Sequence, residues 1–73
     1  IEFYRNAIKT KRAFIHFDMI QHYSWNIIGD DCYEVKIYSQ AGYIIEDFNK
    51  NNFSYFNELY KEYKRVGEQI WVN

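Results

Sequence analysis

The fold of this chain is decided by the stretch Tyr23–Tyr38, whose sequence is YSWNIIGDDCYEVKIY. Apolar residues occupy odd positions on both sides of a short polar segment, namely Tyr23, Trp25 and Ile27 before it and Tyr33, Val35 and Ile37 after it. Because successive strand side chains point to opposite faces, this pattern predicts a β-hairpin with one apolar face. The same alternation begins at Phe14, and a strand that long exceeds the usual length of about 5–6 residues. We therefore expect a bulge or bend near residues 21–22.

The turn of the hairpin is constrained by parity, because directly opposed residues share a face of the sheet. Apolar residues face one another only if the numbers of paired residues sum to an even number. A three-residue loop, Gly29–Asp31, meets this condition, whereas a two-residue loop would place apolar residues opposite polar ones. We predict this loop, or a longer one of the same parity. The predicted pairs are Ile28 with Cys32, Ile27 with Tyr33, Trp25 with Val35, Tyr23 with Ile37, Asn26 with Glu34, Ser24 with Lys36 and His22 with Tyr38.

The segments that flank the hairpin are less strongly patterned. Ser39–Gly42 predicts a second turn, in which Gly42 can adopt a positive φ angle, and Tyr43–Phe48 predicts a third strand. At the N-terminus, Tyr4 and Ile8 lie at helical spacing, so residues 1–13 are predicted to form a short amphipathic helix, with an edge strand as the alternative.

The C-terminal third contains the clearest helical pattern. Apolar residues recur at i, i+3 and i+4 spacing over Phe53–Val66 and predict the main helix. Asn52 or Ser54 is the expected N-terminal cap, and a glycine at position 67 suits a C-terminal cap. Residues 69–72 are predicted to form a final short strand, with Trp71 as an anchor.

Together these elements predict a small α+β fold. We expect a mainly antiparallel sheet of three to four strands, packed against one main helix over residues 53–66, with the short N-terminal helix beside it. A chain of 73 residues has room for one compact domain, residues 1–73, and its 22% aromatic content compensates for the small core.

Composition favours a soluble cytoplasmic protein. Cys32 is the single cysteine, so no intramolecular disulfide forms and a reducing compartment is expected. The chain contains no apolar run long enough to cross a membrane. Ile, Asn, Lys, Tyr and Phe account for 37 of the 73 residues, and these residues have AT-rich codons. This bias suggests an AT-rich bacterium, its phage or a mobile element as the source.

Several kinds of chemistry are disfavoured by the sequence. His16, Asp18 and His22 share a predicted strand face, but His22 lies about 20 Å from His16 along a straight strand, too far to bind the same metal ion. Cys32 has no basic group placed to activate it, and no motif for phosphate or nucleotide binding is present. We therefore expect no catalytic residues, no metal and no cofactor, and a protein that is not an enzyme.

The remaining hypotheses concern binding. Sixteen aromatic residues exceed what so small a core can bury, so some should be exposed and available as interface anchors. Residues 26–49 carry a net charge of −4, which would suit a basic partner. We predict a small inhibitor or adaptor, encoded by a phage or mobile element, that occludes the surface of another protein; self-association through a free sheet edge is also open. The predicted partner-binding residues are Asp30, Asp31, Glu34, Asp47 and Trp71.

The alternative hypothesis is a nucleic-acid-binding module. Basic residues alternate with tyrosines near the N-terminus and on the main helix, where they could supply phosphate contacts and stacking platforms. The residues predicted for this function are Arg5, Lys9, Arg12, Lys61, Lys64 and Arg65.

Overall fold

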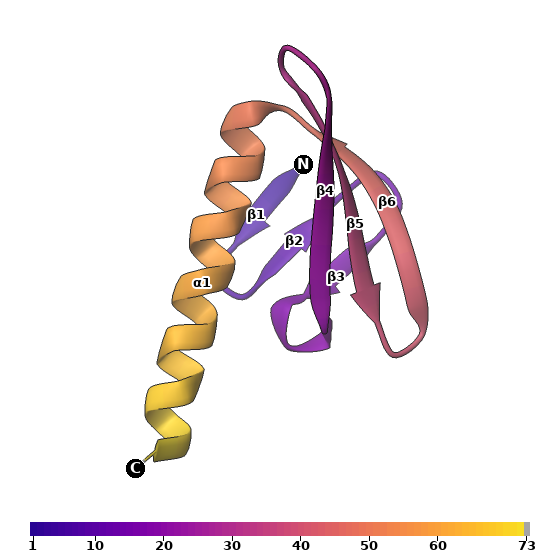
Figure 1. Cartoon of the computed structure of the whole chain (residues 1–73). Coiled ribbons are helices and arrows are strands. Elements are labelled where there is room, and N and C mark those ends of the chain that lie inside the picture. Colours follow the sequence, from indigo (N-terminus) through magenta and orange to yellow (C-terminus); the bar gives the residue numbers. More distant parts are fainter. Residues whose placement is uncertain (73) are drawn as a thin grey trace.

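The computed structural model describes the backbone of residues 1–72 and the side chains of residues 1–66. The described chain forms two antiparallel sheets, each with three strands in sequence order, and one long helix (Figure 1). These elements confirm the predicted α+β class. In chain order they are β1 (Glu2–Tyr4), β2 (Ala7–Lys9), β3 (Phe14–His16), the 3-10 turn η1 (Phe17–Met19), β4 (His22–Gly29), β5 (Cys32–Ser39), β6 (Gly42–Phe48) and α1 (Lys50–Val72).

The core lies where the two sheets and the helix meet. Figure 1 shows the strands of the two sheets crossing one another, with α1 running along one side. Every one of these three units contributes side chains that are buried, so the core is shared and not local to one hairpin. Its members are Ile8 from β2, Phe17 from η1, Ile20 from the segment between η1 and β4, Val35 and Ile37 from β5, Phe48 from β6, and Phe53 and Phe56 from α1.

The predicted pairing of the central hairpin is confirmed from His22–Tyr38 to Ile27–Tyr33, but its loop is different. Gly29 pairs with Cys32, so the turn contains only Asp30 and Asp31. The register shifts between Ile27 and Gly29, which leaves Ile28 as the extra residue of a β-bulge. A two-residue turn alone would place apolar residues opposite polar ones. The extra residue of the bulge restores the predicted pairing of apolar with apolar residues.

The second turn and the third strand also follow the prediction. Ser39 pairs with Gly42, and Gly42 has a φ angle of 131°. Residues with a side chain rarely adopt this backbone conformation, so glycine is the suitable residue there. β6 occupies Gly42–Phe48, one residue longer than the predicted strand.

The prediction of an N-terminal helix is wrong, and the alternative, a strand, is correct. A turn at Arg5 and Asn6 folds β1 back onto β2, which places Phe3 opposite Ile8 and Ile8 opposite Ile15. This cross-strand row packs against the core and includes Ile15, which a helix confined to residues 1–13 could not align with it. Tertiary burial therefore outweighs the helical spacing of this segment.

The long alternation that begins at Phe14 is broken, as predicted, but more completely than by a bend. β3 ends at His16, η1 follows, and β4 begins at His22 in the other sheet. The buried Phe17 side chain lies in η1. The sequence pattern predicted that Asp18 shares a strand face with His16 and His22. This prediction is wrong, because Asp18 lies in the 3-10 turn.

Helix α1 begins earlier and ends later than predicted. Its N-terminal cap is Asn49, not Asn52 or Ser54: the Asn49 Oδ1 atom accepts a hydrogen bond from the Asn52 backbone N–H at 2.7 Å. The helix continues to Val72, so the predicted strand over residues 69–72 is wrong. A glycine within a helix costs only about 1 kcal/mol relative to alanine and keeps its N–H, so the glycine at position 67 does not end the helix.

A second acceptor at the start of α1 comes from the hairpin turn. Asp31 Oδ1 accepts a hydrogen bond from the Lys50 backbone N–H at 2.9 Å. A carboxylate at this position satisfies a free amide and interacts favourably with the helix dipole. The β4–β5 turn is thereby joined to the first residue of the helix.

We predict that Asp31→Ala lowers the free energy of unfolding by about 1 kcal/mol, because the Lys50 amide loses its acceptor. Urea denaturation followed by circular dichroism measures this change. Asp30→Ala is the matched control, since it removes the adjacent carboxylate, and its effect should stay within about 0.5 kcal/mol. Equal losses in the two variants would contradict a capping role for Asp31.

Candidate protein-interaction surface

The sheet β4–β6 has two different faces. Val35 and Ile37 of β5 and Phe48 of β6 point into the core, whereas alternate residues form what we call the outer face. Strand pairing arranges the outer face in three rows across the sheet. These rows are His22, Tyr38 and Tyr43; Ser24, Lys36 and Ile45; and Asn26, Glu34 and Asp47.

The third row brings two carboxylates together. Glu34 of β5 lies directly opposite Asp47 of β6. Like charges at directly opposed positions destabilise a sheet. The ion pairs found among the described side chains join Arg12 to Glu46 and Arg65 to Glu62, so neither involves these two carboxylates.

Lys36 is the cation nearest in sequence on the same face, but it is directed to the aromatic row. Its Nζ atom lies 4.1 Å from the ring centroid of Tyr43 and 5.2 Å from that of Tyr38. The pKa of Lys36 is raised, chiefly by hydrogen bonding to Tyr38. Lys36 is therefore a cation held over two tyrosine rings, and Glu34 and Asp47 are left without it.

The aromatic row is itself ordered by stacking. The rings of His22 and Tyr38 are 4.3 Å apart and nearly parallel, at 15°. Tyr38 and Tyr43 follow with a centroid separation of 5.7 Å. Tyr43 remains 56% exposed and Ile45, in the next row, 38% exposed. The outer face thus has an aromatic end and an acidic end, and the row between them contributes Lys36, which lies over the tyrosine rings, and the exposed Ile45.

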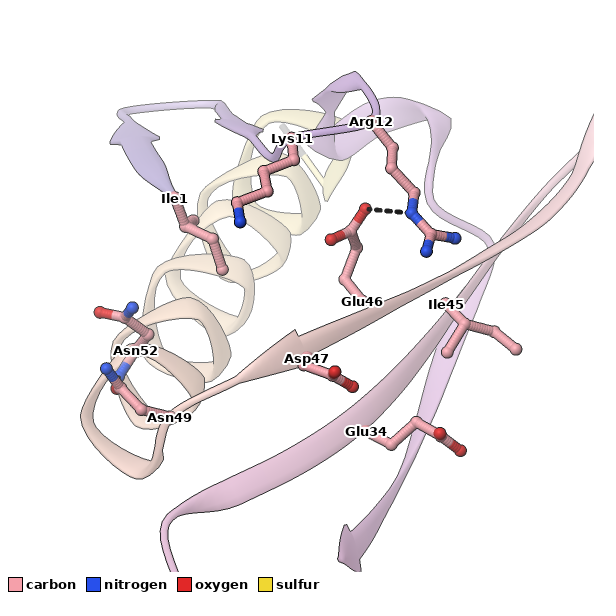
Figure 2. A pocket seen from close by; sticks show the side chains of 9 residues that line it. All are labelled: Ile1, Lys11, Arg12, Glu34, Ile45, Glu46, Asp47, Asn49 and Asn52. Atoms are coloured by element: carbon pink, nitrogen blue, oxygen red, sulfur yellow. Dashed lines mark hydrogen bonds and ion pairs between the residues drawn. The ribbon is translucent and has the colours of Figure 1, made fainter.

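A cleft of about 650 Å³ adjoins the acidic end of the sheet (Figure 2). On the inner side of β6, Glu46 Oε1 accepts a hydrogen bond from the Thr10 hydroxyl at 3.0 Å and lies 3.9 Å from Arg12 Nε. Figure 2 shows Glu46 directed toward Arg12, while Glu34 and Asp47 point away from this pair. Glu46 therefore ties the β2–β3 loop to β6. Glu34 and Asp47 line the same cleft as Lys11 and Arg12, but neither carboxylate forms an ion pair with these two cations.

The structure separates the predicted partner-binding residues into different environments. Glu34 and Asp47 lie together on the outer face, whereas Asp31 caps α1. Asp30 is exposed at the tip of the hairpin. Trp71 lies outside the residues whose side chains are described. Tyr43 and Ile45 were not among the predicted residues, although the parity of the hairpin, extended through the turn at Ser39–Gly42, places both on the outer face.

The residues predicted for nucleic-acid binding are distributed over several elements. Two of them have carboxylate partners: Arg12 pairs with Glu46, and Arg65 with Glu62. Hydrogen bonding between Arg65 and Glu62 lowers the pKa of the carboxyl group and raises that of the guanidinium group. The positions of all six are the β1–β2 turn for Arg5, β2 for Lys9, the β2–β3 loop for Arg12, and α1 for Lys61, Lys64 and Arg65.

The described residues contain no group of three or more histidine, cysteine, aspartate or glutamate side chains that could hold a metal ion. No described helix has the length and apolarity needed to cross a membrane. Comparisons of the chain with protein-family models, with curated proteins and with solved structures found no match.

We predict that Asp47→Lys raises the free energy of unfolding by about 0.5 kcal/mol, because it replaces a like-charge pair with an attractive one. Urea denaturation at low and high salt measures the effect, which should shrink as salt screens the exposed charges. Asp18→Lys, in the exposed 3-10 turn, makes the same change in net charge and serves as the control. An equal stabilisation by both substitutions would show that net charge, and not the Glu34–Asp47 pair, is responsible.

Proposed function

We propose that this chain is a non-enzymatic protein-interaction module that binds a basic surface of another protein and covers it. The observation that carries the proposal is the directly opposed pair of Glu34 and Asp47 on the outer face, which forms no ion pair with any described cation. Their repulsion is unfavourable in the free protein. A cationic partner would relieve it and would also be attracted from a distance.

Exposed apolar side chains beside the carboxylates support the same proposal. Ile45 and Tyr43 lie on the same face of β6 as Asp47, and both are exposed. Aromatic side chains near the centre of an interface commonly contribute much of the binding energy, while charges contribute specificity and association rate. In this proposal Tyr43 and Ile45 supply apolar contact and the acidic row selects a basic partner.

An inhibitor or adaptor would act through such a surface by occlusion alone. The composition bias toward AT-rich codons supports a phage or mobile element as the source, and the single cysteine supports a cytoplasmic location. A natural target in that setting would be a protein with a basic groove, which an acidic sheet face could cover. This function requires no cofactor and no catalytic group.

The proposal predicts that the tagged chain retains a protein partner from a lysate of its source cells after nuclease treatment. Asp47→Lys should reduce the retained amount by about tenfold, because it introduces a charge that repels a basic surface. Asp18→Lys should retain as much partner as the unmodified chain. Mass spectrometry of the eluates measures both effects.

Two results would contradict this proposal. Equal retention by Asp47→Lys would exclude the acidic row as the contact surface. Loss of all partners on nuclease treatment would favour the nucleic-acid alternative, in which case Lys64→Glu combined with Arg65→Glu should abolish retention on nucleic acid at low salt.

A further inference from the structure

Strand β4 forms an edge of its sheet. Among the described residues only β5 pairs with it, so the backbone groups along its other side have no neighbouring strand. Helix α1 does not replace that neighbour, because it contacts the inward side chains of β4: the ring of Trp25 lies 5.1 Å from that of Phe53, and Tyr23 lies 5.0 Å from Phe56. Within the described part of the chain, no other element pairs with this edge.

The side chains of β4 make this edge unusual. It is 8 residues long, with the sequence HYSWNIIG, and contains neither a formally charged residue nor proline. Trp25, Ile27 and Ile28 are 48%, 65% and 54% exposed. Natural sheet edges are commonly protected by charges, proline or short length, since an exposed apolar edge pairs readily with another strand.

The other edge strands differ from β4 in charge or in length. β6 carries the carboxylates of Glu46 and Asp47, and β1 and β3 are each 3 residues long. None of the six basic residues predicted to bind nucleic acid lies in β4. An uncharged strand can pair with an identical copy of itself without bringing like charges together, which a strand such as β6 cannot do as readily.

We propose that two copies of this chain associate through antiparallel pairing of β4 with β4, forming one continuous sheet across a two-fold axis. Matching faces requires that paired residue numbers sum to an even number. The bulge at Ile28 limits the regular part of the strand to His22–Ile27. Centring the axis on Trp25 pairs residues 23–27 with those of the other copy, and it places Trp25 opposite its own copy and Tyr23 opposite Ile27. All three apolar residues of the inner side then lie within the paired region.

This arrangement buries the apolar residues that the monomer leaves exposed on the inner side of β4. It also places the two hairpin tips at opposite ends of the shared sheet, so that Asp30 lies near the His22 end of the other copy and not near a second Asp30. The two rows that contain Glu34 and Asp47 are then far apart. The inference is independent of the proposed function, because the acidic row takes no part in the pairing.

Light scattering and sedimentation equilibrium of the whole chain test the dimer. The unmodified chain should approach twice the 9.0 kDa mass of one copy as its concentration rises. Ile27→Lys should weaken this association by at least about tenfold, since it places two cations beside the pairing strands. Ile45→Lys is the control, because it changes an exposed isoleucine on the opposite edge strand in the same way, and Asp47→Lys should also dimerise normally.

A chain that stays monomeric at every concentration would overturn the proposal, as would a dimer that persists unchanged in folded Ile27→Lys. Hydrogen exchange of the unmodified chain gives a second test that requires no variant. Amides in residues 22–28 should exchange faster on dilution, whereas those in residues 42–48 should not change. Exchange in residues 22–28 that does not depend on concentration would exclude β4 as the interface.

Discussion

The structure depends on one buried aromatic contact region centred on Phe56. The side chain of Phe56 is fully buried, and its ring lies 6.0 Å from that of Phe17, 5.0 Å from that of Tyr23 and 5.5 Å from that of Phe48. These partners come from η1, β4 and β6, so one helical residue joins the connection between the sheets to both edges of the second sheet. Burial of such a ring contributes about 1.5–3 kcal/mol, a large share of the stability of a chain this short.

The same contact region explains which sequence signals could be interpreted correctly. The helix stripe that contains Phe56 and the alternation that contains Tyr23 are both consequences of facing this core, so periodicity revealed them. Residue pairs from His22 to Ile27 followed from parity together with the predicted loop at Gly29–Asp31. The bulge at Ile28 could not be predicted, because a three-residue loop and a two-residue turn with a bulge satisfy the same parity.

Where the prediction failed, a non-local contact had replaced a local preference. Residues 1–13 have helical spacing, yet Ile8 gains more by lying opposite Ile15, a residue beyond the segment. At the start of α1, Asn52 or Ser54 was the predicted cap. The choice of Asn49 depends on where β6 ends, and Asp31 reaches the Lys50 amide only because the hairpin turn lies beside the helix. Asp31 and Lys50 are 19 residues apart, so no short window of sequence contains both partners of that contact.

The two candidate surfaces are the parts of the β4–β6 sheet that the core does not cover. Charge alone indicated Glu34 and Asp47, but their opposition required the β5–β6 register: once Ser39 opposes Gly42, Glu34 must oppose Asp47. That same register places Lys36, the cation nearest in sequence on the outer face, over the ring of Tyr43 and not in an ion pair with the acidic row. The inner face of the sheet is occupied by the core, and its outer face and β4 edge remain. A chain with sixteen aromatic residues cannot bury them all, and Trp25 and Tyr43, which stay exposed at these two surfaces, are held by strands whose backbone is already fixed. Binding at either surface would therefore order few additional residues, which keeps its entropic cost low.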